Sequence, residues 1–240
     1  MRANVQKFPL LLKQGFVNPL RRRSLRVRAV SAPDKDSKVG YGDVDKDIVE
    51  QKAALRQKMR ELRYMLPLGE YHRMSEAIES NLLATPEFRT AKHVCCYVHK
   101  ESTREPETIT ILHAVLADTK KVLVVPITRV KDDRLDLSVV QDLGDLVPST
   151  FGVAEPVHEK LVKSDYVDFI IVPCLAADLH GIRLGYGKAY YDKLLSVIPK
   201  RVAAFALAFD FQVLPNIPSA AHDKHITAIV TEKRIIRCSP

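Results

Sequence analysis

The feature that most constrains the fold of this chain is a nearly continuous apolar run at residues 167–172. A strand with one face in water alternates polar and apolar residues, whereas a run of this kind indicates a strand covered on both faces. It leads through Pro173 and a glycine-containing loop into a helical pattern at residues 188–197. A buried strand followed by a loop and a helix is typical of an α/β domain.

The other segments alternate in the same way. Apolar residues at helical spacing predict helices over residues 43–63, 74–83 and 108–117. Short extended runs predict strands over residues 93–98, 121–125, 134–140, 202–209 and 226–230. We expect Pro126 to end the second of these strands, residues 151–163 to form a loop, and residues 226–230 to be the last strand. The predicted fold is a single three-layer α/β domain with a largely parallel or mixed central sheet flanked by helices.

The net charge of +8 is concentrated at the N-terminus. Residues 1–33 hold eight of the 37 basic residues and no acidic one, so the other 29 basic residues balance the 29 acidic residues of the body. A neutral body gives no general electrostatic case for nucleic-acid binding. The apolar stretch at residues 8–12 is far shorter than the roughly 20 residues that cross a bilayer, so we expect no membrane insertion.

An arginine-rich, acid-free N-terminus without a long apolar segment is typical of an organelle transit peptide. We expect residues 1–33 to be such a peptide, residues 34–43 to be a flexible connector, and residues 44–238 to be the folded domain. The arginine content favours the mitochondrion, while residues 27–30 leave plastid-type cleavage as an alternative. A basic tail that binds nucleic acid or acidic lipid is the other interpretation of residues 1–33.

The four cysteines do not have the spacing of a zinc or redox motif. Cys95, Cys96 and Cys174 lie in or beside apolar runs. We therefore expect buried, reduced thiols.

Residues 172–195 carry the chemistry. Their loop contains three glycines, Gly181, Gly185 and Gly187. Glycines let backbone N–H groups approach an anion closely, and the N-terminus of the following helix adds a favourable dipole. Arg183 and Lys188 supply positive charge, and Asp192 is a carboxylate suited to Mg²⁺ beside phosphate oxygens. The segment predicts a polyphosphate site, with a simple glycine-rich connection as the alternative.

Two common phosphate-binding motifs do not fit. A Walker A loop has four residues between its first glycine and the Gly-Lys pair, whereas five residues separate Gly181 from Gly187. Ala189 also stands where that motif needs serine or threonine. A dinucleotide fingerprint needs a third glycine where this chain has Tyr190.

The residue order R-L-G-x-G-x-x-Y-Y-D after a D-x-x-G loop closely resembles the signature of the 5-formyltetrahydrofolate cyclo-ligase family. The matching residues are Asp178, Gly181, Arg183, Leu184, Gly185, Gly187, Tyr190, Tyr191 and Asp192. The family usually has phenylalanine where this chain has Ala177 and glycine where it has Ala189. Segments at residues 52–56, 105–108, 203–209 and 222–223 are also similar to the family, in the family's order.

This resemblance implies an enzyme that uses ATP and Mg²⁺ to convert 5-formyltetrahydrofolate to 5,10-methenyltetrahydrofolate by phosphorylating the formyl oxygen, with release of ADP and phosphate. It implies ATP contacts from Lys52, Ala53, Ala54, Leu55, Arg56, Arg183, Leu184, Gly185, Tyr186, Gly187, Lys188, Ala189, Tyr190 and Tyr191. It implies folate contacts from Val98, Glu105, Tyr186, Gly187, Lys188, Ala189 and Tyr190. Asp192 and Asp223 would bind Mg²⁺, and Lys188 and Arg183 would act in catalysis. Folate and ATP are the expected partners of a monomer, residues 44–238 being the cyclo-ligase domain.

Simpler interpretations stay open for several of these residues. Taken alone, residues 52–56 would be an exposed helix face, Glu105 an acid favoured by a helix dipole, and Tyr191 a core residue. A non-catalytic folate- or nucleotide-binding protein derived from the same family is the alternative function. A basic nucleic-acid-binding protein would rest on residues 1–33 alone.

Overall fold

The structure, a computed structural model, describes residues 41–239. Its helices are α1 Tyr41–Met65, α2 Leu68–Leu83, α3 Pro86–Thr90, α4 Ile109–Ala117 and α5 Tyr190–Val197. Its strands are β1 His93–Cys96, β2 Val122–Arg129, β3 Arg134–Val140, β4 Leu146–Pro148, β5 Ala154–Pro156, β6 Leu161–Val162, β7 Phe169–Pro173, β8 Ala176–Asp178, β9 Arg183–Leu184, β10 Ala203–Leu207, β11 Val213–Leu214, β12 Ala228–Val230 and β13 Ile235–Arg237. The expected transit peptide, residues 1–33, lies outside the described residues, and α1 begins within the last residues of the expected connector, 34–43.

The main sheet is mixed, with a parallel centre. Its strand order is β13-β12-β10-β7-β1-β2-β3-β6. The strands from β12 to β2 run parallel, and the pairings of β13, β3 and β6 are antiparallel. The prediction of an α/β fold with a largely parallel or mixed sheet is confirmed.

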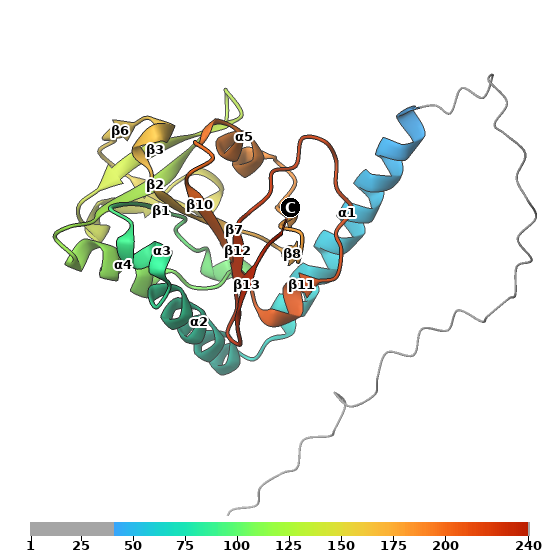
Figure 1. The fold of residues 1–240 in the computed structure, drawn as a ribbon, viewed down its shortest axis with the longest axis horizontal. Coiled ribbons are helices and arrows are strands. Elements are labelled where there is room, and N and C mark those ends of the chain that lie inside the picture. Colours follow the sequence, from blue (N-terminus) through green and yellow to red (C-terminus); the bar gives the residue numbers. More distant parts are fainter. Residues whose placement is uncertain (1–40, 240) are drawn as a thin grey trace, which may run out of the picture. The chain divides into compact units, whose positions relative to one another are not determined.

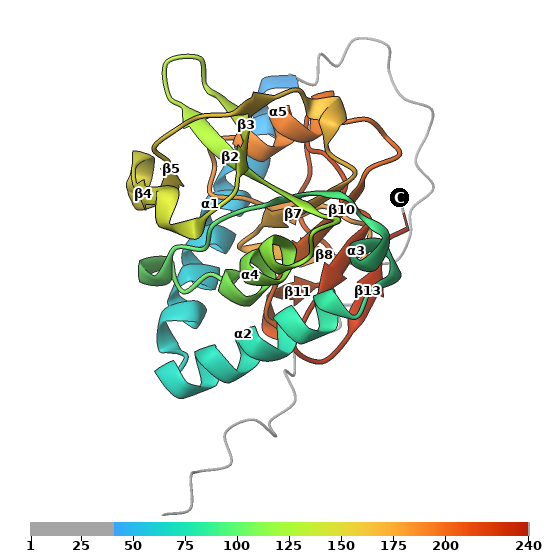
Figure 2. The same ribbon diagram turned by 90° about the vertical axis from the view of Figure 1, so that its left-hand side faces the viewer.

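Strand β7 shows why this domain has three layers. Phe169 and Ile171 belong to one hydrophobic cluster, whereas Ile170 and Val172 belong to the cluster on the opposite face. Helices α2, α3 and α4 cover the first face and α5 covers the second, as Figures 1 and 2 show. Apolar residues therefore occupy both faces of β7, which accounts for its continuous apolar sequence.

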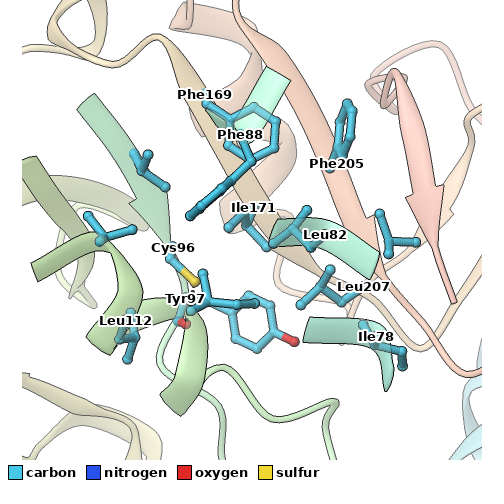
Figure 3. Packing of buried hydrophobic residues seen from close by; sticks show 14 of the residues in the cluster. Ile78, Leu82, Phe88, Cys96, Tyr97, Leu112, Phe169, Ile171, Phe205 and Leu207 are labelled. Carbon is cyan, nitrogen blue, oxygen red and sulfur yellow. Dashed lines mark hydrogen bonds between the residues drawn. The ribbon is translucent and has the colours of Figure 1, made fainter. Parts of the chain in front are cut away.

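Three phenylalanine rings, those of Phe88, Phe169 and Phe205, lie in the upper part of the first cluster as Figure 3 draws it. The ring of Phe169 meets Phe205 at a centroid distance of 4.9 Å and Phe88 at 6.2 Å, both edge to face. Each such pair adds about 0.5–1.5 kcal/mol beyond the burial of its surface. The contacts fix α3 and β10 against β7.

Helix α1 packs against a second, three-stranded sheet of order β11-β8-β9 (Figure 1). Asp178, at the end of β8, is fully buried and accepts backbone hydrogen bonds from Ile182 and Ile217, each 2.9 Å long. Gly181 has φ +86°, and a Cβ there would lie 2.6 Å from the carbonyl oxygen of Ile226. Both residues shape the turn that leads into β9, and Gly181 is required for close packing of the chain.

Three expectations about strands are wrong. Strand β2 continues through Pro126 to Arg129. Pairing with β1 stops at Val124, so Pro126 lies where the strand has β3 as its one neighbour, and proline is tolerated at such edges. Residues 151–163 contain β5 and β6, and β13 follows the strand expected to be the last. Strands β5, β6 and β13 have only two or three residues each, too few to show the alternation of apolar and polar residues that predicts a strand.

The expected state of the cysteines is confirmed. Cys95, Cys96 and Cys174 are buried free thiols. Burial raises the pKa of Cys95 to about 12 and that of Cys174 to about 11. Among the described helices, none is both long and apolar enough to cross a bilayer.

The order of the parallel strands determines where a ligand can bind. From β1 the chain passes through α4 to β2 on one side, whereas β7, on the other side of β1, leads through α5 to β10. The direction of winding therefore reverses between β1 and β7. Ligands of open α/β sheets bind at the carboxyl ends of the strands at such a point.

Candidate active site

A cavity of about 340 Å³ opens where the direction of winding reverses. Its wall includes Tyr97 and Val98, which follow β1, and Pro173 at the end of β7. Pro126 and Thr128 of β2 complete this side. The cavity lies where the strand order predicts a ligand site.

Five aromatic side chains line this cavity, which we call the aromatic cavity: Tyr97, Phe151, Tyr186, Tyr190 and Tyr191. The rings of Phe151 and Tyr190 are 6.4 Å apart between centroids. Phe151 is 54% exposed and has φ +57°, a strained backbone conformation for this residue type. Aromatic rings around a cavity of this kind suit a planar heterocycle.

One carboxylate lies in the wall of the aromatic cavity. Glu105 is 7% exposed, and its Oε2 accepts a 2.8 Å hydrogen bond from the backbone N–H of Lys100. The Lys100 ammonium donates to the carbonyl oxygen of Phe151. Lys100 thus ties the carboxylate to the loop that carries the exposed ring. Lys188 also lines the cavity, and its side chain is exposed.

A second cavity, of about 560 Å³, has charged walls. We call it the charged cavity; its charged members are Lys52, Arg56, Arg183, Asp192 and Asp223. Its apolar lining residues include Ile48, Ala220 and Ala221. Such a site can hold a ligand that has both an anionic and an apolar part.

Lys52 and Asp223 form an ion pair in the charged cavity. Lys52 Nζ lies 2.5 Å from Asp223 Oδ2, which also accepts a 2.7 Å bond from the Ala220 backbone N–H. Burial acts to raise the pKa of Asp223, but the bonds from Lys52 and Ala220 prevail and lower it. Asp223 is therefore ionised at neutral pH.

Arg56 lies one helical turn after Lys52. Its Nε donates to the carbonyl oxygen of Gly185 at 2.9 Å, and a Cβ on Gly187 would lie 3.5 Å from its guanidinium. Burial, followed by repulsion from Arg60, lowers the pKa of Arg56. An anion bound in the charged cavity would favour the cation and oppose both effects.

Arg183 lines both cavities and is 4% exposed. Its Nη1 donates a 2.9 Å hydrogen bond to Asp192 Oδ1, and its guanidinium lies 5.8 Å from the ring centroid of Tyr191. Its Nε has no hydrogen-bond partner among residues 41–239. A buried N–H of this kind is costly unless a ligand satisfies it.

The loop between β9 and α5 separates the two cavities. Arg183, Gly185, Ala189 and Asp192 line both of them. Ala189 precedes α5 with φ +54° and ψ +14°, in the left-handed region that glycine adopts freely. A ligand in either cavity therefore meets the same short segment.

Comparison with known sequences identifies the family. A sequence model of the 5-formyltetrahydrofolate cyclo-ligase family matches residues 48–232, which include every residue that lines the two cavities. The chain belongs to this family. Membership confirms the resemblance read from the signature loop and identifies the chain as an enzyme, a cyclo-ligase.

Relatives of the cyclo-ligase family cover most of the chain. It is 28% identical to the mitochondrial 5-formyltetrahydrofolate cyclo-ligase of Arabidopsis thaliana over 245 aligned positions, 92% of this chain and 88% of the relative. The 5-formyltetrahydrofolate cyclo-ligase of Mycolicibacterium smegmatis is 33% identical over 150 positions, 60% of this chain and 76% of the relative. The NMR structure of 5,10-methenyltetrahydrofolate synthetase from Aquifex aeolicus is similar with a TM-score of 0.68 and 36% identity, covering 78% of this chain and 92% of that one.

The cavities gather most of the residues that the sequence singled out. Val98, Glu105, Tyr186, Lys188, Tyr190 and Tyr191 line the aromatic cavity, and Lys52, Arg56, Leu184, Gly187 and Asp223 line the charged cavity. Ala53, Ala54 and Leu55 line neither: the two alanines are exposed, and Leu55 packs against the core beneath α1. Ala177 is fully buried in the core.

Several residues in or behind the cavity walls were missed, and three of them bear on function. Phe151 and Lys100 lie in loops, where no periodic pattern signals a role, although a phenylalanine beside Gly152 in a polar stretch was a usable hint. Arg63 is 1% exposed and donates to the Tyr186 hydroxyl at 2.9 Å. In sequence it is one of many charges on α1, and nothing distinguishes it.

Asp192 and Asp223 form a donor set that fits Mg²⁺ held together with phosphate. Each carboxylate has one oxygen engaged by protein groups: Asp192 Oδ1 by Arg183, and Asp223 Oδ2 by Lys52. The described residues contain no group of three potential ligands that could hold a metal by themselves. Mg²⁺ is usually bound through one or two carboxylates plus substrate phosphates, so the fit requires a nucleotide.

Proposed function

We propose that this cyclo-ligase converts 5-formyltetrahydrofolate to 5,10-methenyltetrahydrofolate, with ATP and Mg²⁺, by phosphorylating the formyl oxygen. The observation that carries the proposal is the wall shared by an aromatic and a charged cavity. Such a wall allows a planar substrate and an anionic donor to approach one another across a single loop. The reaction needs that arrangement, because positioning supplies much of the rate of phosphoryl transfer.

The chemistry explains the need for a phosphoryl group. The formyl oxygen of an amide-like group is a poor leaving group, so ring closure by N10 cannot expel it directly. Transfer of the γ-phosphoryl group to that oxygen gives a phosphorylated imidate and ADP. N10 then attacks the formyl carbon and loses its proton, and phosphate departs with the oxygen.

The aromatic cavity is the proposed folate site. Val98 and the rings of Phe151 and Tyr190 would pack against the pteridine and its neighbouring ring. Glu105, whose Oε2 accepts from the Lys100 backbone N–H, would accept hydrogen bonds from the ring N–H groups with its remaining lone pairs. A buried carboxylate that pairs with ring N–H groups selects for a ligand that carries them.

The charged cavity is the proposed ATP site. Lys52, Arg56 and Arg183 would hold the phosphates, and the unpaired Nε of Arg183 supports this assignment. Bound Mg²⁺ would neutralise phosphate charge, held by Asp192 and Asp223. Lys188, exposed on the loop, would stabilise charge on the transferring phosphoryl group.

Two broader proposals rest on the sequence and the relatives. The name of the Arabidopsis relative supports a mitochondrial location, with residues 1–33 as the transit peptide and the plastid as the alternative. Residues 34–43 would connect the peptide to the cyclo-ligase domain, 44–238, acting as a monomer.

The test mixes the full chain with 5-formyltetrahydrofolate, ATP and Mg²⁺ and follows the near-ultraviolet absorbance of the methenyl product. We expect absorbance to grow only when both ATP and Mg²⁺ are present, and to stay flat with Asp192→Asn. A flat trace from folded wild-type chain that still binds ATP would overturn the proposal. It would favour a non-catalytic binding protein, which the methyl group of Ala189 in both cavities would help to explain.

A further inference from the structure

Arg63 is a buried cation without an acidic partner. It lies in the last turn of α1, is 1% exposed, and forms no ion pair within residues 41–239. A charge removed from water in this way is costly unless other groups compensate it. Arg63 lines neither cavity, so a ligand does not reach it directly.

The contacts of Arg63 lead to the aromatic cavity. Its Nη1 donates to the hydroxyl of Tyr186 at 2.9 Å, and its Nη2 donates to the carbonyl oxygen of Cys174, one residue after β7. Tyr186 and Pro173 both belong to the cavity wall. The planar fork of a guanidinium can hold two such acceptors at once, which an ammonium cannot do with the same geometry.

Tyr186 accepts from Arg63 and lines the aromatic cavity together with Glu105. Because Arg63 can only donate, the Tyr186 oxygen accepts from it and keeps its own hydrogen for another partner. Burial raises the pKa of Tyr186 and outweighs the opposing effect of the Arg63 cation, while the neighbouring Glu105 carboxylate raises the pKa further, so the hydroxyl stays protonated. Its hydrogen is then available to Glu105, itself 7% exposed in the same wall.

We infer that Arg63 is a positioning residue for the folate site: it fixes the Tyr186 hydroxyl from behind the wall. The inference rests on the proposed function of the aromatic cavity. Lys52, Arg56 and Arg63 follow one another at intervals of four and seven residues, close to whole helical turns, so they share one face of α1. One helix therefore serves both cavities: Lys52 and Arg56 in its middle act at the proposed nucleotide site, and Arg63 at its end acts at the proposed folate site.

The test compares full-chain Arg63→Met with wild type in the methenyl assay, with both substrates titrated. Loss of a hydrogen bond to a charged group should raise the KM for 5-formyltetrahydrofolate about tenfold or more. The KM for ATP and kcat at saturating folate should stay within about twofold. The matched control is Lys58→Met, which removes an exposed cation from the same helix and should change neither KM.

A purely structural role would give a different result. Thermal unfolding and the active fraction would fall, lowering kcat, while the folate KM stayed unchanged; that pattern overturns the inference. Arg63→Lys keeps the charge but loses the fork, so its folate KM should also rise, and this variant decides the matter if Arg63→Met does not fold. The effects of Arg63→Met and Tyr186→Phe on the folate KM should not add, because both break the same contact, and additivity refutes the route through Tyr186.

The experiment distinguishes failure of the proposed function from failure of the inference about Arg63. If the wild-type chain does not turn over, the same variants are titrated with 5-formyltetrahydrofolate by calorimetry. Weaker binding by Arg63→Met than by wild type and Lys58→Met then supports the positioning role. Equal binding by all three contradicts it.

Discussion

Replacing Ala189 by glycine should stabilise the folded chain. Ala189 has φ +54° and ψ +14°, and an L-residue with a Cβ in this region costs about 1–2 kcal/mol. Glycine removes that strain but adds about 0.4–1 kcal/mol of conformational freedom to the unfolded chain. The difference leaves a gain of about 0.5–1 kcal/mol, equivalent to a rise in Tm of about 1–4 °C for a domain of this size.

Thermal unfolding of the full chain measures this change, and Ala53→Gly is its matched control. Ala53 is exposed within α1, where glycine should lower the free energy of unfolding by about 1 kcal/mol. The same substitution should thus have opposite signs at the two positions. A lower Tm for Ala189→Gly would show that the methyl group makes packing contacts worth more than the backbone strain, and would refute the reasoning.

Three further changes test the site. Lys188→Ala should lower kcat by about 10²–10³ if Lys188 stabilises the transferring group, with Tm unchanged because the side chain is exposed; near-normal turnover would remove it from catalysis. Asp192→Asn, which should not turn over, should also weaken the effect of Mg²⁺ on the Kd of ATP, and an unchanged Mg²⁺ dependence of ATP binding would count against Asp192 as a ligand. Because the folded chain lowers the pKa of Asp223 from 3.8, its carboxylate adds stability above that pH and loses it as pH falls further. Urea unfolding should therefore show Asp223→Asn to be destabilised at pH 7, with a difference from wild type that shrinks as pH falls below 3.8, and a difference that does not shrink would contradict this.

The fold was predictable where the apolar pattern of a segment matches its burial between the layers of the domain. The run at residues 167–172 became β7 at the centre of the sheet because its residues fill both faces. Pro126 misled the prediction because the cost of proline depends on which neighbour a strand has, and the sequence does not contain that information. The two-residue strand β6 lies below the length at which any period can be seen.

The site was predictable where a sequence signature specifies the residue types, and less predictable where the role of a residue depends on how it packs in the fold. Lys52, Arg183 and Asp223, far apart in sequence, line one cavity, and their contacts with ATP and Mg²⁺ stay a prediction. Arg63 was not predicted because α1 carries many charged residues, and the sequence does not show which of them is buried. The strain at Ala189 also became visible only through its backbone angles.

The shared wall has a thermodynamic consequence. Arg183, Gly185, Ala189 and Asp192 contribute to the binding free energy of whatever occupies either cavity. When one ligand orders this segment, part of the entropy cost of binding the other has already been met. Linkage is reciprocal, so the factor by which nucleotide changes the Kd of folate must equal the factor by which folate changes the Kd of nucleotide. If the two cavities hold folate and nucleotide as proposed, we therefore expect each substrate to be an effector of the other.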